Sequence, residues 1–208
     1  STPVQGDVLE EPAIDAVRDL RAEVIPAAFA NSGAEVLVTG QTARSLDFRE
    51  LISTYGPIVI GLVLALSFVM LGVAFRSVVI PITSIVVNLL TVGASYGLLV
   101  LVFQKGLGGN LLGFRQTGTI EPWIPLLLFT TLFGLSMGYH VFLMSRIRER
   151  YLRSGDNEDA VWFGVATTGR VITGAALIMV AVFAGFAMGR LVPLQQMGFG
   201  LAVAILID

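Results

Sequence analysis

Residues 122–145 have the sequence P-W-I-P-L-L-L-F-T-T-L-F-G-L-S-M-G-Y-H-V-F-L-M-S, a run of 24 residues without Asp, Glu, Lys or Arg. A helix of ~20 apolar residues, with a rise of ~1.5 Å per residue, is long enough to cross the hydrocarbon core of a bilayer. A helix in the core of a soluble protein usually keeps a polar stripe, and this run has none. The run therefore predicts a transmembrane helix.

Four further runs without charged residues flank this one. They cover residues 51–75, 77–104, 171–189 and 191–207, with lengths of 25, 28, 19 and 17 residues. The last run stops one residue before the end of the chain, so we interpret it as a truncated span. The expected fold class is an α-helical polytopic membrane protein with about five transmembrane helices.

The composition agrees with a membrane protein. The 208 residues have a mass of 22.2 kDa, are 55% hydrophobic and have a mean hydropathy of +0.82. Only 13% of them are charged, about half of the ~25% in an average soluble protein. This excludes an ordinary water-soluble globule, a disordered chain and a nucleic-acid-binding tail. With no Cys and one His, we expect no disulfide, metal site or cofactor. The chain shows no paired carboxylates and no H-E-x-x-H helix, and no enzyme activity is expected.

The first 50 residues differ from the rest. They hold nine acidic residues and four Arg, a net charge of −5, whereas residues 51–208 hold nine basic and six acidic residues, a net charge of +3. The chain begins with Ser1, shows no signal peptide and ends within a span. We therefore expect a piece of a longer protein, with a polar head joined to a membrane body.

The head has signals for both helix and strand. Pro12 is typical of a first helical position and predicts a helix that ends near residues 31–33. Residues 35–39, E-V-L-V-T, predict a short strand, and Thr42 predicts the cap of a helix that runs into the first span. The head is thus expected to be a small α/β piece, too small to bury a good core alone.

The segment 146–170 holds five Arg, more than any other loop. Because cytoplasmic loops are enriched in Lys and Arg, this segment is predicted to be cytoplasmic, and residues 1–50 and 105–121 to lie outside. Residues 156–168 predict an amphipathic helix on the cytoplasmic leaflet. The alternative is a plain solvated connector.

Glycines recur at positions i and i+4 within three spans. The pairs are Gly93–Gly97, Gly134–Gly138 and Gly185–Gly189. This spacing lets two transmembrane helices approach closely, so all six are candidate helix-packing positions. The alternative is chance, because the chain has 23 Gly.

His140 is the strongest candidate for moving protons, because the predicted spans contain no Asp, Glu, Lys or Arg. Its imidazole titrates near neutral pH, and the phenols of Tyr96 and Tyr139 are the other ionisable groups. The alternative is a neutral His that is hydrogen-bonded to a neighbouring helix. The residues themselves leave both interpretations open.

The stretch F-G-L-S-M-G-Y-H-V-F-L-M-S-R at residues 133–146 resembles the pattern F-G-L-S-x-D-Y-E-V-F-L-x-S-R of the MMPL-type transporters in the resistance–nodulation–division superfamily. The sequences A-T-T-G-R-V-I-T-G-A-A-L at 166–177 and G-F-G-L-A-V-A-I-L-I-D at 198–208 are also similar to that family. The resemblance covers roughly residues 35–208 and is most specific over 133–180.

The resemblance implies a plasma (inner) membrane transporter of two halves, each with six spans and an exoplasmic α/β porter domain. Residues 1–50 would be the end of the second porter domain, and residues 51–208 the spans that follow it. Such proteins export lipids or other hydrophobic compounds and are driven by the proton gradient. The implied partners are membrane lipids or a hydrophobic substrate, the remaining half of the transporter and a second copy in a homo-oligomer, but no nucleic acid.

One position departs from the family pattern. The family's proton relay uses an Asp-Tyr pair, but here the Asp position is Gly138, while Tyr139 matches the Tyr and His140 replaces a Glu. Two residues turn a helix by ~200°, so His140 points away from the face of Gly138. Three interpretations follow: coupling through the other half, a route through His140, or an inactive or non-transporting membrane module for lipid binding or assembly.

Overall fold

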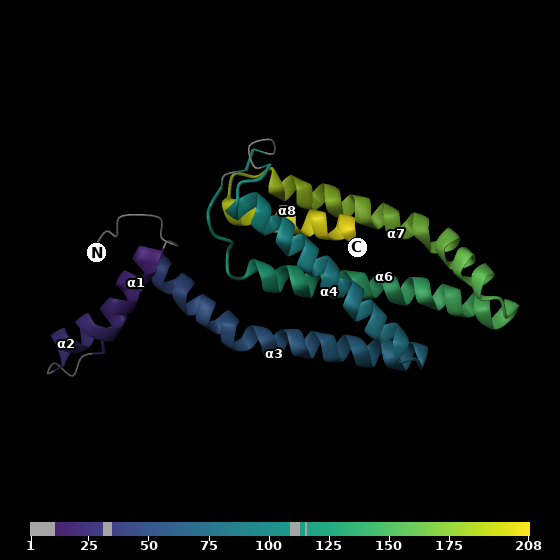
Figure 1. Ribbon diagram of the computed structural model, residues 1–208, viewed down its shortest axis with the longest axis horizontal. Coiled ribbons are helices and arrows are strands. Elements are labelled where there is room, and N and C mark those ends of the chain that lie inside the picture. The colour runs from purple at the N-terminus through teal and green to yellow at the C-terminus, as the bar shows by residue number, and fades with distance from the viewer. Residues whose placement is uncertain (1–10, 31–34, 109–112, 115) are drawn as a thin grey trace. The chain divides into compact units, whose positions relative to one another are not determined.

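The computed structural model describes residues 11–30, 35–108, 113–114 and 116–208. Every regular element in these ranges is a helix (Figure 1). The chain divides into two compact units, Ser1–Gly56 and Pro57–Asp208. The division lies inside one long helix, at Pro57, which lacks the backbone N–H that would continue the helical ladder.

The first unit is held by a polar contact between its helices. It contains α1 (Glu11–Asp19), the π-helical turn η1 (Leu20–Val24), α2 (Ile25–Phe29) and the start of α3 (Gln41–Phe75). The Arg21 guanidinium donates to both carboxylate oxygens of Asp47 on α3, with Nη2 2.9 Å from Oδ2, and also to the Val38 carbonyl at 3.3 Å. The Arg21 hydrogen bond lowers the pKa of the Asp47 carboxyl.

Two predictions for this unit are wrong. Residues 35–39 form no strand, because a strand needs a paired neighbour and the described residues provide no second strand. The α/β piece predicted for the head is therefore not shown: its described regular elements are helices, and residues 35–39 have no regular structure. Thr42 is not a cap, since α3 already begins at Gln41. The expected helix end at 31–33 lies outside the described residues.

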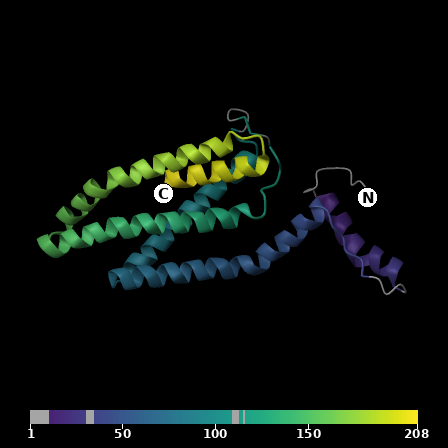
Figure 2. The same cartoon turned by 180° about the vertical axis from the view of Figure 1, so that it is seen from behind.

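The second unit is a bundle of long apolar helices. After α3 come α4 (Val79–Leu99) with its π-helical end η2 (Val100–Gln104), α6 (Ile124–Ser154), α7 (Asn157–Ala187) and α8 (Val192–Ile207). Four helices in the described part of the chain (α3, α4 with η2, α6 and α7) are long and apolar enough to cross a membrane, whereas α8 is shorter. Figures 1 and 2 both show α8 beside α7, and α8 also packs on α4 and α6. The predicted polytopic helical fold is confirmed.

Helices α6 and α7 extend beyond the predicted spans and meet at a tight corner. The segment 146–170 is helical except at Gly155 and Asp156, where Gly155 has a φ of 70° and Asp156 caps α7. Residues 156–168 are thus helical as expected, but they form the cap and first turns of α7 rather than a separate helix.

Arginine side chains hold this corner together. Arg150 on α6 binds Asp159 on α7 through two hydrogen bonds of 2.6 and 3.2 Å and lies over the Phe163 ring. The Arg150 hydrogen bond lowers the pKa of Asp159. Arg148 donates to the Ala74 carbonyl in the last turn of α3 at 2.8 Å, which satisfies a carbonyl that the helix leaves free.

The glycines in close helix contacts are not the predicted ones. A Cβ at Gly93, Gly97, Gly134, Gly138 or Gly185 would have no atom within 4 Å, and at Gly189 it would meet only the nearby Phe186 carbonyl at 3.0 Å. By contrast, a Cβ on α8 at Gly198 would lie 2.5 Å from backbone atoms of α7, and one at Gly200 would lie 2.7 Å from Leu99. Among the described residues, packing of α8 therefore depends on glycines outside the GxxxG pairs.

Gln196 ties the start of α8 to the loop before α6. Its side chain is 1% exposed, donates to the Thr119 carbonyl at 3.0 Å and accepts from the Glu121 amide at 3.0 Å. These contacts fix α8 relative to α6 at one end of the bundle, and the far end of α8 leads to the cavity described next.

Candidate functional site

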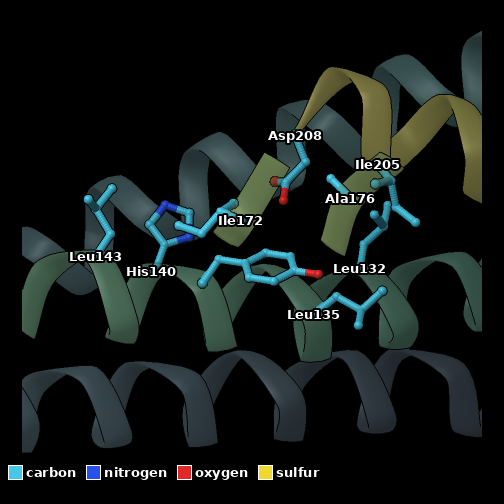
Figure 3. A pocket seen from close by; sticks show the side chains of 9 residues that line it. Leu132, Leu135, His140, Leu143, Ile172, Ala176, Ile205 and Asp208 are labelled. Atoms are coloured by element: carbon cyan, nitrogen blue, oxygen red, sulfur yellow. The ribbon is translucent and has the colours of Figure 1, made fainter. Parts of the chain in front are cut away.

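A cavity of 190 Å³ lies between α6, α7 and α8 in the second unit (Figure 3). Six of its nine lining residues are apolar, and the other three carry groups that can bind or release a proton. The lining residues are Leu132, Leu135, Tyr139, His140, Leu143, Ile172, Ala176, Ile205 and Asp208. Figure 3 shows the Asp208 side chain pointing from the end of α8 into this space.

Ser136 on α6 is the centre of the polar contacts beside the cavity. Its Oγ lies 2.7 Å from Asn88 Oδ1 on α4, 3.0 Å from Asp208 Oδ1 and 3.2 Å from His140 Nδ1. Ser136 and Asn88 are each 1% exposed. Groups from α4, α6 and the end of α8 therefore meet at a single hydroxyl.

His140 is fixed through one of its ring nitrogens. Nδ1 lies 3.0 Å from the Ser136 carbonyl oxygen, which can only accept, so Nδ1 carries a proton in this contact. In the neutral ring this leaves Nε2 without a proton. Both of these His140 contacts are therefore with Ser136 on its own helix, α6, rather than with a neighbouring helix.

The other two predicted relay positions behave differently. Tyr139 lines the cavity, but its hydroxyl donates to Met179 Sδ on α7 at 3.5 Å. Gly138 is exposed and does not line the cavity. The structure therefore brings His140 and Asp208 each to the Ser136 hydroxyl, whereas Tyr139 lines the same cavity and its hydroxyl binds Met179.

Sequence reasoning missed Asn88, Ser136 and Asp208. Asn88 carried the clearest signal, because an amide in the middle of a charge-free run needs a hydrogen-bond partner. Asp208 follows the last apolar run, where a charged residue usually marks the end of a span. Ser136 gave little signal, since an isolated Ser is common in membrane helices.

The pattern G-x-S-x-G occurs at Gly134, Ser136 and Gly138, with His140 and Asp208 nearby, but the geometry is not that of a serine hydrolase. In those enzymes the pattern forms a sharp strand-to-helix turn, whereas here it lies inside α6. In a catalytic triad the acid binds the His, whereas Asp208 binds Ser136 itself. The arrangement therefore lacks the geometry of a serine hydrolase.

Known proteins resemble this chain along nearly its whole length. The profile described as MMPL family matches residues 2–208. The "Mycolic acid-containing lipids exporter MmpL11" of Mycolicibacterium smegmatis is 43% identical over 94% of this chain and 20% of its own length. The "Heme uptake protein MmpL11" of Mycobacterium tuberculosis is 44% identical over 84% of the chain and 18% of its own length.

The "Trehalose monomycolate exporter MmpL3" of Mycobacterium tuberculosis is 37% identical over 85% of the chain and 18% of its own length. The chain thus spans about a fifth of the length of the curated relatives it matches.

Proposed function

The chain belongs to the MMPL family, and from this membership we propose that it is part of a proton-motive-force-driven transporter that exports lipids or other hydrophobic compounds. Two of the relatives are named as exporters of lipids, and one is named for uptake of heme, which is also largely apolar. A hydrophobic cargo is common to these names. The remaining parts of the transporter and the membrane lipids are its partners.

The observation that carries the proposal is the contact of Asp208, His140 and Asn88 at Ser136 inside a bundle of long apolar helices. Polar and ionisable groups within a membrane bundle are costly and typically mark a functional path. In this proposal Asp208 provides the carboxyl group that the family pattern expects at Gly138.

The proton moves from His140 to Asp208 through the Ser136 hydroxyl. A cationic His140 gives its Nδ1 proton to Ser136 Oγ while Ser136 gives its own proton to the Asp208 carboxylate. His140 is left neutral, Asp208 is left protonated, and the hydroxyl is restored. The distances of 3.2 and 3.0 Å between the heavy atoms support such a transfer.

The orientation in the membrane follows from the arginines. We propose that the protein lies in the plasma (inner) membrane with the corner of α6 and α7 in the cytoplasm and residues 1–50 outside. Arg146, Arg148, Arg150 and Arg153 at the end of α6 support this orientation, because cytoplasmic ends of spans are enriched in Arg.

Reconstitution of the full-length protein tests the proposal. In proteoliposomes with a pH gradient and a fluorescent lipid as cargo, we expect transport that stops when the gradient is collapsed. Asp208→Asn is expected to abolish it. Ser95→Ala is the matched control, because Ser95 is buried on α4 and its hydroxyl donates to the carbonyl of Thr91, on its own helix. Transport that ignores the gradient, or persists in Asp208→Asn, would contradict the proposal.

A non-transporting membrane module is the second candidate, and Gly138 at the relay position favours it. A Cβ at 138 would have no atom within 4 Å, so an Asp fits there without displacing neighbours. If the native protein moves no lipid under a gradient and Gly138→Asp creates gradient-driven transport, the protein is an altered copy of a transporter. If neither protein transports, a lipid-binding or assembly role is favoured.

A further inference from the structure

The proton positions around Ser136 depend on the state of its neighbours. Asn88 Oδ1 faces Ser136 Oγ at 2.7 Å, while Asn88 Nδ2 is buried and has no hydrogen-bond partner among the described residues. Ser136 has one proton, yet both Asn88 Oδ1 and Asp208 Oδ1 lie within acceptor distance of it. The amide donates nothing, and the hydroxyl faces two acceptors.

We propose that Asn88 is a positioning residue that responds to the protonation of Asp208 through Ser136 and so couples α4 to the proton site. The role in transport rests on the proposed function, but the hydrogen-bond chemistry does not.

When Asp208 is protonated, the chain of hydrogen bonds runs in one direction. The Asp208 O–H donates to Ser136 Oγ, and Ser136 donates to Asn88 Oδ1, as the 2.7 Å contact shows. Asn88 Nδ2 is then left without a partner, as observed. This row of hydrogen bonds uses the amide orientation that the structure has.

When Asp208 is ionised, the direction of these hydrogen bonds must reverse. The carboxylate can only accept, so it takes the Ser136 proton, and Asn88 Oδ1 would then oppose a lone pair of Ser136 at 2.7 Å. A half-turn of the amide brings Nδ2 to Ser136 Oγ, which satisfies the orphaned donor, and moves Oδ1 to the position that Nδ2 had. Only hydrogen bonds change. Asn88 Nδ2 then donates to Ser136, Ser136 donates to the Asp208 carboxylate, and this row of donors stabilises ionised Asp208.

Few other groups can influence this site. Within the described residues that line the cavity, α6 contributes the titratable groups of Tyr139 and His140, α8 leads to Asp208, and the α7 residues Ile172 and Ala176 are apolar. The α4 neighbour in contact is Asn88, which does not titrate.

Infrared difference spectroscopy of the full-length protein measures this coupling without transport. The C=O stretch of protonated Asp208 is followed across pH and identified by its loss in Asp208→Asn. In Asn88→Leu, which has a similar size but no donor, and in Ser136→Ala, we expect the midpoint of this titration to rise by about one pH unit. Ser136→Thr keeps a hydroxyl and should restore the midpoint, and Ser95→Ala should not move it.

An unchanged midpoint in folded Asn88→Leu and Ser136→Ala would overturn the proposal, as would an equal rise in Ser95→Ala. Folding is checked by helical circular dichroism, and if Asn88→Leu does not fold, the comparison of Ser136→Ala with Ser136→Thr decides. If Asp208→Asn stops transport while Asn88→Leu leaves the midpoint unchanged, the proposed function stands and this inference fails. If the midpoint rises but Asp208→Asn still transports, this inference stands and the proposed function fails.

Discussion

At the residue scale, two substitutions of His140 separate hydrogen bonding from proton transfer. Gln retains an N–H that can reach the Ser136 carbonyl, now bound by Nδ1 at 3.0 Å, whereas Ala retains nothing. Because the proposed path needs a group that binds and releases a proton, we expect His140→Gln and His140→Ala to lose gradient-driven transport equally and completely. Lipid transport assays on both variants check this, and substantial activity in His140→Gln alone would indicate a hydrogen-bonding role.

His140 could be identified from the sequence because it is the only His and lies inside a charge-free run. Its partners could not, since Asn88 and Asp208 are 48 and 72 positions from Ser136 and are brought to it by helix packing. Helical spacing places Ser136 and His140 one turn apart, but it gives no information about contacts between helices.

At the element scale, Gly198 and Gly93 make a matched pair of glycines in membrane helices. A Cβ at Gly198 would lie 2.5 Å from the Ala187 nitrogen and the Phe183 carbonyl oxygen, which are backbone atoms that cannot swing away. We expect Gly198→Ala to lower the free energy of unfolding by ~1–3 kcal/mol. Gly93→Ala meets no atom within 4 Å and should leave stability unchanged or slightly higher. Thermal unfolding in detergent compares them, and equal losses would show that the close contact of α7 and α8 is wrong.

The corner of α6 and α7 gives a pH prediction. The Arg150 hydrogen bond lowers the pKa of Asp159 below the ~3.9 of a free Asp. The ion pair therefore stabilises the fold above the pKa of a free Asp, and this stabilisation is lost as the pH falls through the lower pKa that Asp159 has in the folded protein. Asp159→Asn should therefore lower the melting temperature at neutral pH, by little because the pair is exposed, and the difference should vanish in acid.

The control for this corner is Glu158→Gln, which changes an adjacent exposed acid. It should not reproduce the pH dependence, and a melting difference for Asp159→Asn that persists in acid would show that Asp159 acts through packing or capping instead.

Charge-free runs predicted the long helices because burial in lipid excludes charges, but they placed several helix ends wrongly. Helix α6 continues to Ser154 because Glu149 pairs with Arg146 and Arg153 at helical spacing, and these pairs stabilise turns outside the membrane. Residues 35–39 have the composition of a strand, yet strands depend on pairing that local sequence does not supply. The length of a charge-free run therefore predicts that a helix is present, whereas the positions of the helix ends depend on side-chain contacts.

At the scale of the whole molecule, the proposed mechanism depends on how the bundle is oriented in the membrane, which we infer from the distribution of its arginines. In a proton-driven exporter the proton site must be accessible from one side of the membrane at a time. Which side that is depends on the end of the bundle that faces the cytoplasm. Gln196 anchors α8 at one end, and the cavity lies at the other end of the same helix. Movement of α8 against α6 would therefore alter the contact of Asp208 with Ser136 while the anchored end stays fixed.

Cysteine labelling in intact cells tests the orientation on which this direction depends. The chain has no Cys, so single cysteines introduced into the full-length protein on a cysteine-free background report one position each. Ser154 at the end of α6 and Gln41 at the start of α3 are both exposed, in different units. We expect Gln41→Cys to react with a membrane-impermeant maleimide in intact cells and Ser154→Cys to react only after permeabilisation, because the arginines near Ser154 hold that end in the cytoplasm. The opposite pattern would contradict the proposed orientation of the bundle.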